Sequence, residues 1–274
     1  MTQHNFPNSM KAKFFFIFAA LALVFSCTKI DDESEKGNKT EDDSGEVIVT
    51  SSFTAIAITV NGFTYVTYAD ELSIFKERGI EFTSGCEAKV FDQYVNWFLS
   101  EERHDLVLSI KDKSGTWSSY DGKNAYLEYL NANQTDFSGV IVCETLTKRA
   151  NVASGLEAAQ VTKAKKKYEI EVDGFGKTTE PKIIDFSKNP SGIDFYCTDD
   201  YDVHLTNYLV WLLDNETRDF KFRILDAGSG SEVSAYKATQ GKCVEFSQAD
   251  YSEDDYPGVG YGVHVALTYG SFSR

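Results

Sequence analysis

The chain contains one stretch of sequence twice, and this repeat limits what it can fold into. Residues 94–112 read YVNWFLSEERHDLVLSIKD, and residues 208–226 read YLVWLLDNETRDFKFRILD. The two stretches align without a gap at an offset of 114 residues. Shorter matches flank them at offsets of 112 to 119 residues: 60–63 with 172–175, 79–82 with 192–195, and 136–140 with 255–259. The sequence therefore predicts a duplicated unit of roughly 100 residues, which is close to the usual size of one domain.

Each unit is rich in short runs that predict β-strands. They are separated by Gly, Asn, Asp and Ser, and in the first unit they lie at 56–60, 80–82, 106–110, 126–129 and 140–143. Alternation of apolar and polar residues is typical of a half-buried strand, and many short strands with turn signals indicate an antiparallel sandwich. The sequence therefore predicts a mainly β protein with two tandem antiparallel β-sandwich domains.

The residues around the repeated tryptophans leave a second interpretation open. Apolar side chains recur there with helical spacing: Phe91, Tyr94, Val95, Phe98 and Leu99, then Leu205, Tyr208, Leu209, Leu212 and Leu213. The same runs are dense in Val, Tyr, Trp and Phe, which fit a pleated sheet, and the flanking strands favour that interpretation. The alternative is an α+β unit with one helix at about 88–102 and one at about 201–215.

The first 26 residues have the pattern of a secretory signal peptide. Lys11 and Lys13 precede an apolar run at 14–24, which is followed by Phe25, Ser26 and Cys27. The run is too short for a membrane-spanning helix, which needs about 20 apolar residues.

Two short motifs here carry a family resemblance. Residues 24–27, VFSC, resemble the lipobox of bacterial lipoproteins, and residues 28–33, TKIDDE, resemble the signal that sends lipoproteins of Bacteroidota to the cell surface. The resemblance implies that Cys27 is acylated and anchors the chain in a membrane through its N-terminal lipid. It also implies an outer-membrane location on the cell surface.

Amino-acid composition predicts the bounds of the tether, the two repeats and the linker. Residues 27–45 contain Ile30 as the one aliphatic residue, so this segment cannot bury enough apolar surface to fold, and we expect a disordered acidic tether. The first repeat then spans 46–150 and the second spans 166–274. Residues 151–165 between them show little apolar periodicity and predict a linker.

The charge of the chain excludes one class of partner. Removal of residues 1–26 leaves 25 basic and 42 acidic side chains, so the formal charge is −17. Nucleic acid is bound largely by neutralising phosphates with Lys and Arg, so we expect no nucleic-acid partner.

A second resemblance concerns the cysteines. Cys86, Trp97 and Cys143, with the run DFSGVIVC at 136–143, resemble the immunoglobulin pattern. This implies immunoglobulin-like domains in which Cys86 and Cys143 bridge two sheets over Trp97. The second repeat matches at Cys197 and Trp211 but has no second cysteine at the matching place.

Export would put these thiols in an oxidising compartment, where pairing is expected. Cys243 lies earlier in its repeat than the pattern requires, and a bridge from it to Cys197 is geometrically demanding. Buried free thiols are the alternative for all four cysteines.

The sequence carries no strong catalytic motif, neither a nucleophile elbow nor a zinc-binding His-Glu-x-x-His, and we expect no enzyme. Asp199, Asp200 and Asp202 form an acidic loop that could hold calcium. Solvated acidic loops are commoner, so we expect no cofactor, with calcium at these three aspartates as the alternative.

Aromatic residues supply the candidate ligand-binding site. Trp117 and Tyr120 lie in a polar stretch and could stack on a sugar or anchor a protein. A weaker candidate of the same type is the tyrosine group of the second repeat: Tyr251, Tyr256, Tyr261 and Tyr269. We therefore expect a surface binding or adhesion module for glycan or protein. The alternative is a non-enzymatic accessory subunit of an outer-membrane complex.

Overall fold

The computed structural model describes residues 48–49, 53–75, 79–150, 165–198, 203–253 and 255–274, and these belong to one compact unit. The predicted signal peptide, Cys27 and the tether lie outside the described residues. In the part of the chain that the structure describes, no helix combines the length and the apolar character that a membrane crossing needs.

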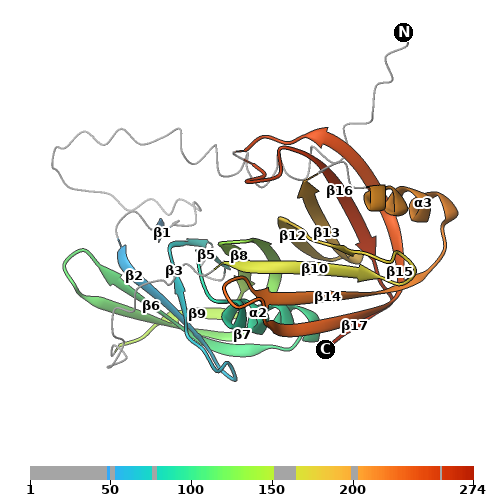
Figure 1. The fold of residues 1–274 in the computed structure, drawn as a ribbon. Helices are drawn as coiled ribbons and strands as arrows, with labels where there is room; N and C mark the ends of the chain where they lie inside the picture. The colour runs from blue at the N-terminus through green and yellow to red at the C-terminus, as the bar shows by residue number, and fades with distance from the viewer. Residues whose placement is uncertain (1–47, 50–52, 76–78, 151–164, 199–202, 254) are drawn as a thin grey trace, which may run out of the picture. The chain divides into compact units, whose positions relative to one another are not determined.

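The described fold is mainly β with antiparallel strand pairs, as predicted (Figure 1). One sheet belongs to the first repeat alone, and we call it the first flanking sheet. Its strands in spatial order are β3 (Thr67–Ala69), β2 (Phe53–Val60), β6 (His104–Asp112), the first half of β7 (Trp117–Asn133) and β9 (Thr145–Lys148).

The second repeat builds the same arrangement, which we call the second flanking sheet. Its strands in spatial order are β11 (Thr178–Thr179), β10 (Lys166–Val172), β14 (Arg218–Asp226), the first half of β15 (Glu232–Asp250) and β17 (Ser271–Ser273). Strand for strand, its order repeats that of the first flanking sheet.

A third sheet takes strands from both repeats, and we call it the shared sheet. The first repeat contributes β1 (Ile48–Val49), β4 (Glu71–Phe75), β5 (Gly79–Ser84), β8 (Phe137–Val142) and the second half of β7. The second repeat contributes β12 (Ile183–Lys188), β13 (Ser191–Thr198), β16 (Tyr261–Thr268) and the second half of β15. Antiparallel pairing of β7 with β12 joins the two sets.

The long strands β7 and β15 each pass from a flanking sheet into the shared sheet (Figure 1). At the transition, each has one residue with a left-handed backbone, Asn124 at φ 47° and Gln240 at φ 54°. Gly241 follows Gln240 because a Cβ there would lie 2.7 Å from the carbonyl oxygen of Arg218. These local bends let one strand serve two sheets.

The repeated tryptophan stretches begin with helices rather than strands. Helix α2 spans Ala88–Ser100, and the 3₁₀ turn η2 (Val203–Leu205) leads into helix α3 (Thr206–Asp214). The α+β alternative is therefore confirmed in this respect. The immunoglobulin placement of Trp97 on a strand is corrected, because the residue lies on α2.

The same aromatic arrangement holds each helix in its repeat. Phe63 meets Tyr94 and Trp97 edge-on, and Phe175 meets their counterparts Tyr208 and Trp211 in the same way. Each indole N–H donates to a backbone carbonyl five residues further on, at 2.9 Å in the first repeat and 2.8 Å in the second. The tryptophans are thus core residues, as expected from their repeated position.

The core is continuous across the two repeats. Helix α2 contacts β14 and β15 of the second repeat, and the rings of Phe98 and Phe186 lie 5.9 Å apart. Lys166, at the start of β10, is buried and donates from Nζ to the carbonyls of Cys86 (3.2 Å) and Thr135 (3.0 Å) in the first repeat. Apolar packing and buried hydrogen bonds therefore both connect the repeats.

Candidate functional site

A row of acidic residues crosses the shared sheet within the second repeat. Phe186 contacts α2 and Phe195 contacts α3, so their sequence neighbours Asp185 and Asp194 point to the opposite, outer face. Strand register places Asp185 beside Asp194, Asp194 beside Ala266, and Ala266 beside Glu245. We call Asp185, Asp194 and Glu245 the acidic row.

Asp185, the first member of the acidic row, is hydrogen-bonded to the first repeat. Asp185 is almost fully buried and accepts hydrogen bonds from the hydroxyl of Tyr129 (3.0 Å) and from Nδ2 of Asn131, both on β7. Burial raises the pKa of the Asp185 carboxyl, and these two hydrogen bonds oppose that rise. Asp185 therefore ties the row to the junction between the repeats.

The other two carboxylates are partly open to solvent. The side chain of Asp194 is 38% exposed and that of Glu245 is 29% exposed. Burial, followed by the nearby charges of Asp185 and Glu245, raises the pKa of Asp194 to about 6. Burial is the larger cause of this shift, and the two neighbouring carboxylates add to it.

His264 is buried and lies between the two partly exposed acids, Asp194 and Glu245. His264 is 6% exposed; its Nδ1 lies 3.5 Å from Oε1 of Glu245, and its Nε2 lies 4.0 Å from Oδ2 of Asp194. Burial lowers the pKa of His264 more than Glu245 raises it, so the imidazole is neutral at neutral pH. Within the described ranges, no Lys or Arg forms an ion pair with the acidic row, and Nε2 of His264 has no hydrogen-bond partner.

Tyrosine rings border the acidic row. Tyr196 stacks on His264 with ring centroids 4.5 Å apart and an interplanar angle of 19°. Tyr256 and Tyr251 follow at 4.6 Å and 5.4 Å from the Tyr196 ring, and both are partly exposed. We call Tyr196, Tyr251 and Tyr256 the tyrosine cluster. Two of these residues belong to the tyrosine group noted in the sequence.

The first repeat has no equivalent of this site. Strand register aligns the positions Asp185, Asp194, Ala266 and Glu245 with Ser73, Glu81, Val140 and Tyr129 of the first repeat. At these four positions the first repeat has one acid, Glu81, and it has the larger Val140 where the second repeat has Ala266. The acidic row is thus specific to the second repeat.

The candidate ligand residues Trp117 and Tyr120 do not form one site. Both lie on β7, where Trp117 pairs with Lys111 and Tyr120 pairs with Leu108. They are three positions apart in a regular strand segment, so they point to opposite faces. Trp117 is half-buried with Nζ of Lys111 5.8 Å from its ring, and Tyr120 packs on the core.

The expected bridge between Cys86 and Cys143 is not formed. Cys86 follows β5 and Cys143 follows β8, and the antiparallel pairing of these strands puts the two residues at opposite ends, roughly 20 Å apart. A disulfide needs Cα atoms within about 7 Å. Burial raises the pKa of the Cys86 thiol to about 12 and that of Cys143 to about 11.

Cys197 and Cys243 are not bridged either. They lie on β13 and β15, the two strands on either side of β16. Two strand spacings separate their backbones by about 10 Å, which is too far for a disulfide. Within the described residues, these four cysteines are buried and form no disulfide.

The candidate calcium ligands Asp199, Asp200 and Asp202 lie outside the described residues. Among the residues that the structure does describe, no group of three or more His, Cys, Asp or Glu side chains is arranged to hold a metal ion. The acidic row therefore does not constitute a preformed metal site.

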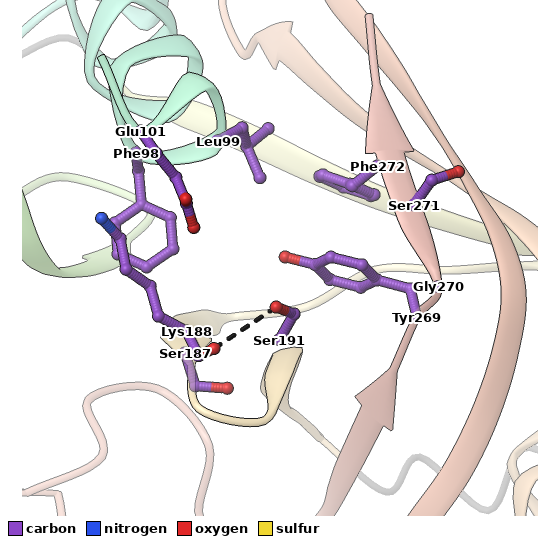
Figure 2. A pocket seen from close by; sticks show the side chains of 10 residues that line it. All are labelled: Phe98, Leu99, Glu101, Ser187, Lys188, Ser191, Tyr269, Gly270, Ser271 and Phe272. Carbon is purple, nitrogen blue, oxygen red and sulfur yellow. Dashed lines mark hydrogen bonds between the residues drawn. The ribbon is translucent and has the colours of Figure 1, made fainter.

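A small pocket lies where the two repeats meet (Figure 2). Figure 2 shows the end of α2 on one side, with Phe98 and Glu101, and Lys188 and Tyr269 of the second repeat on the other. Its volume is about 130 Å³, below the roughly 300 Å³ at which ligand pockets begin. Nζ of Lys188 lies 4.8 Å from the Phe98 ring, so the lysine packs against the wall of the pocket.

Helix α3 presents a second notable surface. Its residues Leu209, Val210 and Leu213 are exposed, at 39%, 51% and 74%. Val95 occupies the position of Leu209 in α2 and is fully buried. The apolar face of α2 that contains Val95 is therefore buried, whereas the matching face of α3 is exposed to solvent.

Sequence reasoning missed the acidic row. Asp194 falls in the repeat match of 79–82 with 192–195, but nothing in that match indicates a binding site. The available signal was a histidine within an apolar run, because residues 261–268 read YGVHVALT. In a strand, such a residue shares its face with polar side chains of neighbouring strands.

Comparisons with known proteins add little to this picture. No family model matches the chain, and no curated protein sequence matches it. Among solved structures, the chain is similar to the inhibitor of motility MotI/DgrA of Bacillus subtilis, with 7% sequence identity and a TM-score of 0.23 over 82% of this chain and 90% of that one. A TM-score of this size is too low to support an assignment of fold or function.

Proposed function

We propose that the protein is a lipid-anchored, non-enzymatic binding module of the cell surface, which binds a glycan through the outer face of its second repeat. Cys27 is the proposed anchor, and the acidic tether separates it from the folded unit. The lipobox resemblance supports the anchor. It supports an outer-membrane location as well.

The observation that carries the proposed binding function is the juxtaposition of the acidic row and the tyrosine cluster. Partly exposed carboxylates can accept hydrogen bonds from sugar hydroxyls, and partly exposed tyrosine rings offer apolar surface with a polar tip. The first repeat has the same strands without this combination. A structural role common to both repeats therefore does not account for the acids.

The test is a glycan-array screen with the chain lacking residues 1–27. Its variants are the double substitution Asp194→Asn with Glu245→Gln and the control Glu81→Gln, which changes the matching acid of the first repeat. We expect the wild type and the control to bind the same glycans and the double variant to lose them. Binding that survives the double substitution would move the site elsewhere, and release of reducing ends from a bound glycan would make the protein an enzyme.

A second candidate function is supported by α3. An accessory subunit of an outer-membrane complex needs a surface for a protein partner, and exposed apolar side chains mark such surfaces. Leu209, Val210 and Leu213 offer one. Retention of the native partner complex by Leu213→Asp would count against this candidate. Loss of the complex with glycan binding intact would support it.

A further inference from the structure

We infer that the ligand group recognised by the carboxylates of Asp194 and Glu245 is a primary ammonium, carried by an amino sugar. This inference rests on the proposed glycan-binding function and specifies the sugar. Four features of the site support it: a missing hydrogen-bond donor, uncompensated charge, a small residue between the acids, and the adjoining rings.

The missing donor lies between His264 and Asp194. Because Nδ1 of His264 faces Glu245 at 3.5 Å, the proton of the neutral imidazole belongs on Nδ1, and Nε2 is an acceptor. Nε2 then faces another acceptor, Oδ2 of Asp194, at 4.0 Å. His264 is more than nine-tenths buried, and the described residues provide no donor to its Nε2. An ammonium has three N–H donors and no acceptor, so it suits this gap.

The charge of the site favours a cation over a neutral donor. Asp194 and Glu245 have no Lys or Arg partner among the described residues, and burial leaves His264 uncharged at neutral pH. Hydrogen bonds between a charged donor and a carboxylate are roughly twice as strong as neutral ones. An ammonium would therefore gain from both acids.

Ala266 is the small residue that separates the two acids. Ala266 lies between Asp194 and Glu245 on the sheet, so the backbones of the two acids are about 10 Å apart, two strand spacings. Ala266 is buried, and its methyl group is smaller than the side chain of Val140 at the matching place in the first repeat. A metal ion is a poorer occupant, because the described acids do not gather into a set of three ligands.

The rings favour an amino sugar over a lysine side chain. Tyr251 and Tyr256 are partly exposed beside the acidic row, with ring centroids 5.0 Å apart. A sugar ring attached to the ammonium can lie against such rings, whereas the flexible stem of lysine needs no aromatic platform.

The test compares two ligands that differ in one group. Isothermal titration at pH 7 and 150 mM salt would use the trimer of glucosamine and the trimer of N-acetylglucosamine, in which acetylation removes the charge. The wild-type chain without residues 1–27 should bind the glucosamine trimer at least tenfold more tightly. Asp194→Asn and Glu245→Gln should each weaken its binding at least tenfold. Glu81→Gln should leave it unchanged, which separates the site from general attraction to an acidic protein.

The pH dependence gives a second measurement that needs no variant. The titratable groups facing Asp194 are Asp185, Tyr129, Glu245, His264, Tyr196 and Tyr256. Because the pKa of Asp194 is about 6, its carboxylate gains a proton between pH 7 and pH 5. Binding of the glucosamine trimer should fall over that interval, by up to about tenfold.

The outcomes separate the two proposals. Equal binding of both trimers, or binding of neutral glycans alone, would overturn the ammonium inference and leave the glycan-binding function standing. Preference for a lysine trimer over the glucosamine trimer, lost in Asp194→Asn, would assign the ammonium to a protein. Absence of binding to every glycan would overturn the proposed function itself.

Discussion

Removing the hydroxyl of Tyr236 should weaken the whole folded unit, because this group connects the two repeats. Tyr236 on β15 is buried and donates to the carboxylate of Asp92 on α2, which is also buried. The other oxygen of Asp92 pairs with the Arg274 guanidinium at 3.1 Å, and that side chain is half exposed. Tyr236→Phe therefore deprives a buried carboxylate of its buried donor. A hydrogen bond to a charged group contributes about 1.5–3 kcal/mol, so we expect a loss of about 2 kcal/mol.

Urea unfolding followed by tryptophan fluorescence measures this loss, and each repeat has its own reporter in Trp97 and Trp211. The control is Tyr120→Phe: Tyr120 pairs with Leu108 as Tyr236 pairs with Phe222, but its hydroxyl makes no hydrogen bond within the described residues. The control should lose less than about 0.5 kcal/mol. In a thermal melt, Tyr236→Phe should lower Tm by about 4–8 °C. A loss below about 0.5 kcal/mol for Tyr236→Phe, or two transitions of which one alone shifts, would refute the view that this contact couples the repeats.

Three further predictions follow from buried polar groups and the α3 surface. Asp194→Asn should stabilise the protein at pH 7 by about 1 kcal/mol after allowance for solvent screening, because ionisation of a carboxyl whose folded pKa is raised to about 6 disfavours the folded state. The gain should vanish as pH falls from 6 towards 4, which thermal melts at pH 4, 5 and 7 would detect. Lys166→Met should cost about 2–4 kcal/mol in urea unfolding, since it leaves two buried carbonyls without their donor; an unchanged midpoint would contradict this. Leu213→Asp should change stability by less than about 0.5 kcal/mol, because the side chain is exposed, and a larger loss would mean that it packs on the folded unit.

The sequence predicted the β-rich class because alternating apolar residues and turn residues are local signals. The helix was harder to assign, because residues 90–98 combine a helical stripe with β-favouring residues. In the structure α2 buries Val90, Phe91, Val95 and Trp97 on several sides, since it lies between its own repeat and the second one. A helix that is buried on several sides needs large apolar side chains, even those with low helix propensity. The amino-acid composition of residues 90–98 therefore indicated a strand. The spacing of apolar residues was the better guide.

The disulfide prediction failed for a different reason. The spacing of Cys86, Trp97 and Cys143 fits an immunoglobulin pattern, but spacing does not state the direction in which a strand runs. Here β5 and β8 are antiparallel neighbours, and each cysteine follows the end of its own strand. Antiparallel pairing places such ends far apart, so the same residues that suggested a bridge cannot reach each other.

The acidic row could not be assembled from the sequence, because its members meet only through strand order. Asp185 and Asp194 come from the two neighbouring strands of one hairpin. On the sheet Ala266 lies between Asp194 and Glu245, although it comes after both of them in the chain. A bulge between Cys243 and Glu245 shifts the register by one residue as well. Without that bulge, the side chain of residue 245 would point to the other face.

The two repeats share their internal packing and differ in their surfaces. The aromatic contacts to each tryptophan and the indole hydrogen bond are the same in both, so the packing inside each repeat has been retained. The differences lie on surfaces. The first repeat uses the face of α2 to bind the second repeat, while the matching face of α3 stays open. The outer face of the shared sheet carries Val140 in the first repeat, where the second has Ala266 between two acids. Uncompensated charge near a junction destabilises the fold, and the first repeat shows that the fold does not need it. The acids of the second repeat are therefore the feature on which the proposed glycan binding rests.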